Sequence, residues 1–345
     1  MASKQINVGG VLIGGGAPVT VQSMTNTKTE NVQETAAQIN ELAAAGCDIV
    51  RLAVPSVEAA RAISKIKEAV SIPVVADIHF DYKLAVEAAY AGADKIRINP
   101  GNIGGEDNVK AVVKVCREKG LPVRIGVNGG SIERDILEKH GGLTAQALAS
   151  SALRHVEILN RFDFDDICLS VKASSVPLTV EAYRLLSEQT SCPLHLGVTE
   201  TGTEYIGTIK SAIGIGALLL DGIGDTIRVS LTAQPVREVA AGIEILRAAG
   251  IRNCGVELIS CPTCGRTCID LINIATEVQQ RLSDCNRDIV VAVMGCVVNG
   301  PGEARRADYG IAGGQNEGVL FKKGEIIKKV PSAKLVDELI ELIEG

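Results

Sequence analysis

The sequence predicts an α/β protein: a TIM (β/α)8 barrel with a leading hairpin over residues 1–250, followed by a small α+β domain over residues 251–345. Two observations predict this fold. Short β-rich runs alternate with longer amphipathic segments from residue 17 to residue 232, and this alternation stops after residue 250. With 345 residues, of which 46% are hydrophobic, the chain is long enough to bury one large core and a smaller second one.

Eight β-rich runs are the candidate strands of the barrel. They cover residues 17–25, 47–54, 73–79, 95–100, 122–128, 166–174, 193–200 and 225–232. The segments between them, such as 31–46, 56–70 and 235–250, carry apolar residues at helical spacing and often end in glycine. Eight parallel strands, each followed by a helix, close into a barrel. A doubly wound open sheet is the structural alternative, and the segment 6–18 predicts a hairpin that caps the barrel's lower face.

The pattern after residue 250 is different. It runs from a strand through a CPTCG turn to a helix, a second apolar strand, a glycine-rich stretch, a short hairpin and a terminal helix. This order is typical of a small α+β domain. Its boundary is expected between Arg252 and Gly255, without a long linker.

Composition excludes several classes of protein. A formal net charge of −6 argues against a general nucleic-acid or membrane surface, so any anion must be met by a local group of cations. The N-terminus lacks the apolar core of a secretory signal, and no run approaches a membrane span. We therefore expect a cytoplasmic protein, in which the ten cysteines indicate metal or redox chemistry rather than disulfides.

Polar side chains gather where the predicted barrel strands end. Active sites of TIM barrels lie at the carboxyl ends of the strands, and residues two apart on a strand share a face. The residues at these ends are Arg51, Asp77, His79, Arg97, Asn99, Arg124, Asn128, Ser170, Lys172, Glu200, Arg228 and Ser230. The predicted barrel mouth is therefore rich in arginine and lysine.

Five cations at one mouth predict a multiply charged anion. Only Asp77 and Glu200 stand out as balancing carboxylates, and unpaired buried cations are costly, so a diphosphate is the simplest ligand. Arginine suits this role because its planar guanidinium binds phosphate oxygens in pairs. The alternative is that each arginine only pairs with a neighbouring carboxylate.

Two residues of this mouth have a possible chemical role. Glu200 is a candidate proton donor or acceptor, and its structural alternative is a salt bridge to Lys172 or Arg228. His79 can hydrogen-bond a phosphate or a hydroxyl, although a single histidine there is also compatible with a structural role.

The strongest local signal is a cysteine motif in the small domain. Cys261 and Cys264 form a C-x-x-C turn, and Cys296 follows 32 residues later in MGCVVNGPGE. Such turns hold zinc or iron. All four histidines lie in the barrel half, which excludes a Cys-His zinc site within the small domain.

Two ligand sets remain for this metal. Glu303, seven residues after Cys296, can return to the same metal as an oxygen ligand, which suits a [4Fe-4S] cluster with one displaceable ligand. Zinc bound by four cysteines, with Cys268 as the fourth, is the alternative.

Seven motifs, in order along the chain, carry a resemblance to a known family. They are VQSMTNT, ADIHFDYKLA, RINPGNIG, RIGVN, GIGDTIRVSL, CPTCGRT and MGCVVNGPGEA. Together they resemble the bacterial two-domain 4-hydroxy-3-methylbut-2-enyl diphosphate synthases of the methylerythritol phosphate pathway, iron-sulfur enzymes of isoprenoid precursor biosynthesis.

The resemblance implies an activity and its partners. The reaction is the reductive ring opening and dehydration of 2-C-methyl-D-erythritol 2,4-cyclodiphosphate, with electrons from flavodoxin or ferredoxin. The resemblance also implies a head-to-tail homodimer, in which the cluster domain of one chain covers the barrel of the other.

The resemblance further implies roles for individual residues. Cys261, Cys264 and Cys296 bind a [4Fe-4S] cluster with Glu303 as the fourth ligand, and Glu200 is the acid or base. The positions that match substrate binding are Arg51, Arg97, Asn99, Arg124, Asn128, Lys172, Arg228 and Ser230, with Asp77 and His79 in a matching motif. Cys268 follows the CPTCGRT match, and no role is assigned to it.

Two other functions stay open at this point. One is a zinc-stabilised, anion-binding barrel protein without redox activity. The other is a pterin-type or aldolase-like barrel that uses Lys172 to form a Schiff base.

Overall fold

The computed structural model describes residues 3–252, 255–283, 285, 287–296 and 304–345. The chain divides into two compact units, residues 1–252 and residues 253–345, and each is described by itself. None of the described helices is both long enough and apolar enough to cross a membrane.

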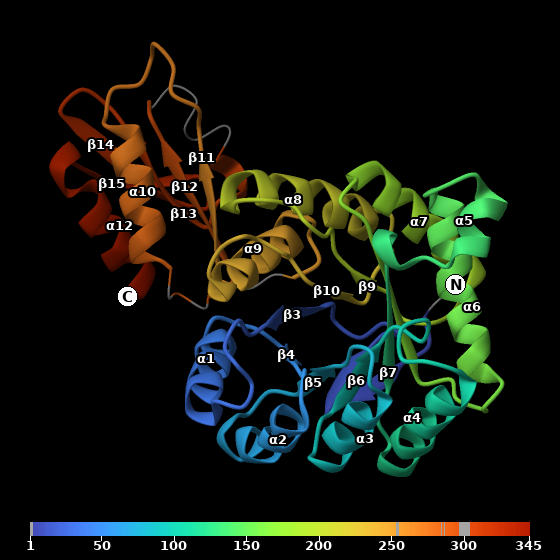
Figure 1. The fold of residues 1–345 in the computed structure, drawn as a ribbon. Helices are drawn as coiled ribbons and strands as arrows, with labels where there is room; N and C mark the ends of the chain where they lie inside the picture. Colours follow the sequence, from blue (N-terminus) through green and yellow to red (C-terminus); the bar gives the residue numbers. More distant parts are fainter. Residues whose placement is uncertain (1–2, 253–254, 284, 286, 297–303) are drawn as a thin grey trace. The chain divides into compact units, whose positions relative to one another are not determined.

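The first unit is a barrel of parallel strands surrounded by helices (Figure 1). Its strands are β3 (Thr20–Met24), β4 (Ile49–Ala53), β5 (Val74–Asp77), β6 (Lys95–Ile98), β7 (Val123–Asn128), β8 (Ile167–Lys172), β9 (His195–Leu196) and β10 (Thr226–Ile227). They pair in the order β8-β7-β6-β5-β4-β3-β10-β9, and a bridge between Leu169 and Leu194 joins the two ends of this series. The predicted TIM barrel is confirmed, and the open doubly wound sheet is excluded because the ring is nearly closed.

Helices follow the strands and bury their apolar faces against them. They are α1 (Val32–Ala44), α2 (Val57–Ala69), α3 (Tyr82–Tyr90), α4 (Glu106–Lys119), α5 (Arg134–His140), α6 (Ala145–Asn160), α7 (Val176–Gln189), α8 (Glu204–Leu220) and α9 (Pro235–Ala248). Several begin at a side-chain cap, as where Ser56 and Thr144 accept a backbone N–H three residues on. Since the apolar residues recur at helical spacing, one face of each helix joins the main core.

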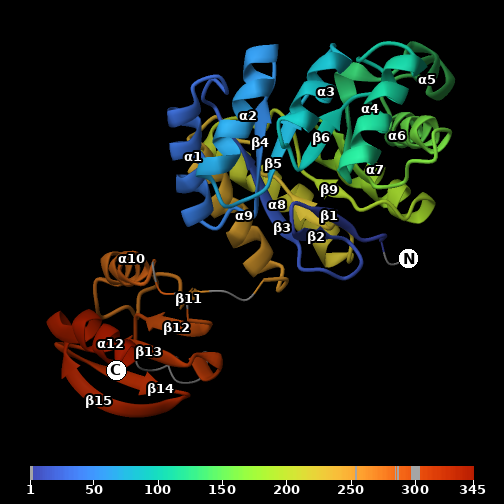
Figure 2. The ribbon, with the colours of Figure 1, turned by 90° about the horizontal axis from the view of Figure 1, so that it is seen from below.

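A hairpin closes the end of the barrel where the strands begin. β1 (Ile6–Val8) pairs antiparallel with β2 (Val11–Ile13), and this hairpin packs against inward-facing residues of β4, β5 and β8 (Figure 2). Ile6, Val8 and Ile13 are buried there with Ile49 and Val75. The hairpin fills the barrel bottom with apolar side chains, so the polar mouth lies at the opposite end.

The second unit is an α+β domain built on a five-stranded sheet. Its elements are β11 (Val256–Ser260), α10 (Leu271–Arg281), β12 (Ile289–Met294), β13 (Tyr309–Gly313), β14 (Glu317–Lys322), β15 (Glu325–Pro331) and α12 (Leu335–Glu344). β11, β12 and β13 are parallel, whereas β13, β14 and β15 are antiparallel. The turn from β14 to β15 runs through Lys323 and Gly324, both with positive φ, which suits the predicted hairpin.

Candidate active site

The polar residues predicted at the barrel mouth lie on the strand ends or in the loops that follow. Arg51, Asp77, Arg97, Arg124, Asn128, Ser170 and Lys172 are on strands, and His79, Asn99, Glu200, Arg228 and Ser230 are in the loops beyond them. The predicted extension of the seventh strand to Glu200 and of the eighth strand to Thr232 was wrong. β9 ends at Leu196 and β10 at Ile227, because only two residues of each pair in the barrel ladder.

Asp77 is the central carboxylate on one side of the mouth. Its Oδ1 accepts a hydrogen bond from Arg97 Nη1 at 3.0 Å, and its Oδ2 lies 3.7 Å from Arg51 Nε and 3.5 Å from His79 Nε2. Arg97 Nη1 also lies 3.1 Å from His79 Nε2. Asp77 therefore holds two of the predicted anion-binding arginines and the histidine in one cluster.

The charge of Asp77 is fixed by its neighbours. Burial alone would raise the pKa of this carboxyl group, but the charges of Arg51 and Arg97 and the contact with His79 outweigh that effect and hold the pKa well below its usual range. Asp77 is therefore ionised at every physiological pH, and it offsets part of the positive charge at the mouth.

Two other cations at the mouth have no carboxylate partner among the described residues. Arg124 is 1% exposed, and its Nε and Nη1 have no hydrogen-bond partner within the described ranges. Lys172 is 8% exposed, and no described acid forms an ion pair with it. Unpaired buried donors of this kind are rare and costly, so they favour a ligand that supplies acceptors.

Burial and mutual repulsion act on these cations together. Burial, followed by the charges of Arg228 and Arg124, lowers the pKa of Lys172 well below its usual value. Burial and the charge of Arg97 lower the pKa of Arg124 to about 10. An anion bound among them would relieve this repulsion, which makes the mouth complementary to a multiply charged ligand.

Two glycines make room for these long side chains. A Cβ at Gly126 of β7 would stand 2.6 Å from Arg97 Nε, and a Cβ at Gly197 would stand 2.6 Å from Lys172 Nζ. Because real Cβ atoms do not approach so closely, any larger residue would displace the cation. The absence of a side chain at Gly126 in RIGVN and at Gly197 in the 193–200 segment thus allows Arg97 and Lys172 to take their positions.

One buried carboxylate at the mouth was not predicted from the sequence. Glu238 on α9 is 5% exposed and lies 3.3 Å from Arg228 Nη2 through its Oε2. The sequence offered no signal for it beyond an acid in the first turn of a helix. By contrast, Glu200, which the sequence analysis named as a balancing carboxylate, is exposed and forms no ion pair among the described residues.

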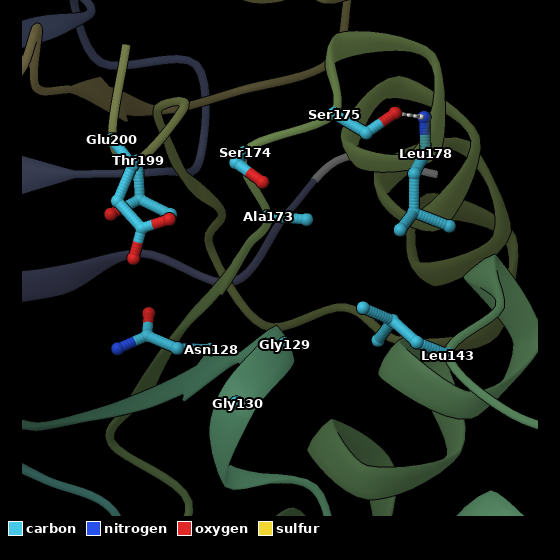
Figure 3. Close-up of a pocket in the computed structure, with 10 residues that line it drawn as sticks. All are labelled: Asn128, Gly129, Gly130, Leu143, Ala173, Ser174, Ser175, Leu178, Thr199 and Glu200. Carbon is cyan, nitrogen blue, oxygen red and sulfur yellow. Dashed lines mark hydrogen bonds between the residues drawn. The ribbon is translucent and has the colours of Figure 1, made fainter. Parts of the chain in front are cut away.

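A pocket of about 180 Å³ lies where β7 and β8 end, and it is lined by the residues that directly follow Lys172 in the chain (Figure 3). Asn128, Thr199 and Glu200 line one side of it, and Leu143 and Leu178 line the other. In Figure 3 the side chains of Glu200 and Asn128 point toward each other. Glu200 has φ of 54°, a conformation that non-glycine residues adopt rarely and that is frequent at functional sites.

The two predicted asparagines are joined through one serine. Asn99 Nδ2 donates to Ser131 Oγ at 3.0 Å, and the backbone N–H of Asn128 donates to the same oxygen at 3.2 Å. The Asn99 side chain is thereby oriented by the loop after β7.

Two of the predicted metal ligands lie just after the ends of neighbouring strands in the second unit. Cys261 follows β11 directly and Cys296 lies two residues after β12, and these two strands are parallel neighbours. Cys261 Sγ accepts a hydrogen bond from the Gly295 backbone N–H at 3.2 Å. Cys264 lies in the turn that follows, where its N–H donates to Thr267 Oγ1 at 3.2 Å.

These residues fit a thiolate-bound metal centre in part. Sulfur that accepts backbone N–H bonds is the environment expected of a ligating thiolate, and Cys261 has it. The pKa of Cys264 is lowered, first by a backbone hydrogen bond from Arg266. However, no three His, Cys, Asp or Glu side chains of the described ranges are close enough to hold a metal ion. Glu303 lies outside the described residues.

Cys268 stays beside this site. Its backbone N–H donates to the Gly295 carbonyl at 2.9 Å, while its thiol is exposed and donates to the Arg266 carbonyl. Cys268 and Cys261 thus both bond to the backbone of Gly295, Cys268 through its N–H and Cys261 through its sulfur.

Two family descriptions match the chain and together cover both units. The GcpE TIM-barrel domain matches residues 3–243, and the GcpE protein C-terminal domain matches residues 257–345.

Curated relatives match the chain over nearly its whole length. A protein of Ruminiclostridium cellulolyticum is 59% identical over 99% of this chain and 97% of its own length, and one of Clostridium perfringens is 59% identical over 99% and 98%. A protein of Geobacter sulfurreducens is 57% identical over 99% and 97%. Each of the three is named 4-hydroxy-3-methylbut-2-en-1-yl diphosphate synthase (flavodoxin).

Two solved structures resemble part of this chain. Yersinia pestis dihydropteroate synthase matches with a TM-score of 0.53 at 15% identity, covering 71% of this chain and 97% of that one. A type I 3-dehydroquinate dehydratase of Clostridium difficile matches with a TM-score of 0.51 at 14% identity, covering 72% and 99%. At such identities the likeness supports the barrel fold and carries nothing about chemistry.

Proposed function

Because this chain belongs to the GcpE family, we propose that it is a 4-hydroxy-3-methylbut-2-en-1-yl diphosphate synthase that takes its electrons from flavodoxin. The reaction opens the ring of 2-C-methyl-D-erythritol 2,4-cyclodiphosphate with two electrons and two protons and releases one water. The single structural observation that carries the proposal is the barrel mouth, where five buried or half-buried cations face only two buried carboxylates.

The diphosphate is bound by the cations of the mouth. Arg124 and Lys172 supply donors that have no partner among the described residues, and Arg51, Arg97 and Arg228 add charge from neighbouring strands. Asn99, Asn128 and Ser230 lie at the same strand ends and orient the neutral part of the substrate through hydrogen bonds. His79 and Asp77 keep two of the arginines in place.

Glu200 is the residue that moves a proton. It lines the pocket opposite the apolar residues Leu143 and Leu178, next to Asn128, and it forms no ion pair with the residues that the structure describes. A carboxylate in such a position can accept or give a proton at a carbon or oxygen of the bound substrate.

The cofactor proposed for the second unit is a [4Fe-4S] cluster held by Cys261, Cys264 and Cys296, with Glu303 as the fourth ligand. When bound, such a cluster supplies single electrons and a Lewis-acidic iron. The support is the placement of Cys261 and Cys296 at adjacent strand ends and the backbone hydrogen bond to the Cys261 sulfur. Every cysteine among the described residues is free of a disulfide, which suits the reducing cytoplasm.

A homodimer completes the proposal, with one chain's small unit covering the other chain's barrel. Support comes from α8, whose outward face carries the exposed residues Ile206, Ile209, Ile213 and Leu220. Their spacing of three, four and seven places them on one helix face, and an exposed apolar face of this kind suits contact with a second copy of the chain. Ile213→Asp is therefore expected to yield a monomer by light scattering, whereas the equally exposed Ile326→Asp in the small unit is expected to leave the dimer intact.

The test is anaerobic turnover of the cyclic diphosphate by the full chain with reduced flavodoxin. A brown protein with about four irons per chain and formation of the linear diphosphate are expected. A colourless zinc protein that binds diphosphate without turnover would instead support the non-redox anion-binding alternative. Glu200→Gln should keep substrate binding and lose turnover, while Glu181→Gln, an exposed acid on α7, should change neither.

A further inference from the structure

Glu238 connects three parts of the barrel that the sequence places far apart. Its Oε1 accepts from the Leu231 backbone N–H at 2.9 Å, its Oε2 lies 3.4 Å from Ser23 Oγ, and both oxygens lie 3.3 to 3.4 Å from Arg228 Nη2. Ser23 is on β3, Arg228 follows β10, and Glu238 itself is on α9. Such a carboxylate, nine-tenths buried, is costly unless several donors surround it, as they do here.

The loop that Glu238 holds carries two of the proposed substrate-binding residues. Arg228 and Ser230 lie on it, and Leu231 is bonded directly to the carboxylate. On its other side the loop is tied to the segment after β9, where the Thr232 N–H donates to the Gly202 carbonyl at 2.9 Å and the Thr201 hydroxyl donates to the Ser230 carbonyl. Glu238 therefore holds one side of the β10–α9 loop, and the segment that directly follows Glu200 holds the other side.

The contact also fixes which part of Arg228 stays available. Glu238 engages Nη2 alone, and the buried Nε has no hydrogen-bond partner in the described part of the chain. A guanidinium held by one nitrogen keeps its plane fixed while it offers its remaining N–H groups to an anion. The guanidinium of Arg228 is thereby oriented before the ligand binds, so less side-chain conformational entropy is lost on binding.

We propose that Glu238 is a positioning residue that orients Arg228 and the β10–α9 loop for binding of the substrate's diphosphate. The inference rests on the proposed function, and it adds a residue on an outer helix to the set of residues that determine affinity. Glu238 has no part in the chemical step; it acts through Arg228.

The Glu238 variant and its control are chosen to leave the net charge unchanged. Replacing Glu238 by glutamine would also remove a negative charge near the anion, which by itself strengthens anion binding and opposes the loss of orientation. Glu238→Asp keeps the charge and shortens the side chain by one methylene, so it cannot reach Leu231 and Arg228 together. The matched control is Glu244→Asp, because Glu244 is an exposed acid on the same helix that pairs with Arg247 at 2.6 Å.

Binding of inorganic diphosphate to the full chain is measured by calorimetry in the wild type, in each variant and in the Arg228→Met background. Glu238→Asp is expected to weaken binding about fivefold, close to 1 kcal/mol, and to add less than twofold when Arg228 is absent. Ser23→Ala, which removes one neighbour of the carboxylate without touching any charge, is expected to weaken binding about twofold and keeps the test usable should Glu238→Asp not fold.

Three results are decisive. Wild-type affinity in Glu238→Asp overturns the inference, and so does an equal loss of affinity with and without Arg228, because the residue would then support the barrel in general. A wild-type protein that does not bind diphosphate at all overturns the proposed function instead. Glu244→Asp is expected to bind as the wild type does.

Discussion

The barrel mouth and the cysteine end of the small unit are built in different ways. At the mouth, Asp77 and Glu238 hold three arginines by ion pairs within the chain, and Gly126 and Gly197 clear the space for Arg97 and Lys172. At the cysteine end, the sulfur atoms of Cys261 and Cys264 each accept a hydrogen bond from the backbone, and Cys264 is exposed. The polypeptide itself organises the first site, whereas the second is expected to need its metal.

The largest expected effect tests the cysteine end. Cys296→Ser should lose iron and lower turnover at least ~100-fold. Loss of a residue that only hydrogen-bonds a metal ligand lowers activity by up to about 100-fold, and loss of the ligand itself is expected to cost more. If the two sites are organised independently, this variant should bind inorganic diphosphate with wild-type affinity. Iron content, visible absorption and calorimetry measure the three quantities.

Cys285→Ser is the control for that experiment, because Cys285 lies in the same unit and is not a predicted ligand. Loss of diphosphate binding in Cys296→Ser would break the comparison, since the mouth would then depend on the second unit.

The next largest effect concerns the support of the mouth. Asp77→Asn leaves Arg51 and Arg97 buried without their counter-charge and should lower the free energy of unfolding of the barrel by roughly 3–5 kcal/mol. Chemical denaturation at pH 7 measures it, with the exposed Asp107→Asn as control.

The same variant has a pH signature. Because the folded pKa of Asp77 lies below its unfolded value of about 3.9, its stabilisation is complete above that pH and is lost as the pH falls further. The difference between wild type and Asp77→Asn should therefore be constant from pH 8 to pH 5 and shrink below about pH 4. A difference that instead grows in acid would contradict the assigned role.

Lys172 gives an intermediate effect on binding. Lys172→Met removes an unpaired donor and should weaken diphosphate binding about 10- to 100-fold, as expected for a hydrogen bond to a charged group. Lys65→Met, an exposed lysine of α2, is the control. A borohydride-trapped adduct at Lys172 in the wild type would favour the Schiff-base barrel over the diphosphate enzyme.

The smallest expected effect is a gain in stability, which is opposite in sign to the loss expected for Asp77→Asn. Lys95 is fully buried and its Nζ has no hydrogen-bond partner among the residues described, and burial lowers its pKa to about 8. The cost of burying its charge is therefore full below pH 8 and disappears as the pH rises toward about 10.4, its unfolded value. Lys95→Met should stabilise the barrel by about 1–3 kcal/mol at pH 7 and by less at pH 9.5.

Urea denaturation at the two pH values checks this last prediction, with the exposed Lys114→Met as control. Destabilisation of Lys95→Met at pH 7 would mean that the barrel interior holds a partner for this ammonium group.

The sequence determined the features that depend on local order. Period-two and helical patterns define β/α units regardless of distant contacts, so the barrel, the α+β domain and the position of Arg97 or Lys172 at a strand end were predictable. The cysteine motif was recognisable for the same reason, because its spacing is short. The roles of the predicted site residues remain predictions.

Tertiary structure alone decided the contacts between distant segments. Glu238 lies 215 residues from Ser23 in the sequence, where it resembles any acid in the first turn of a helix. Folding nevertheless brings it into contact with Ser23 and Arg228. Likewise, nothing local shows that Gly197 clears space for Lys172 or that β9 stops at Leu196. The strand ends meet only when the barrel closes. The environment of each charged side chain at the mouth is therefore set by residues that are distant in sequence, and no local pattern predicts it.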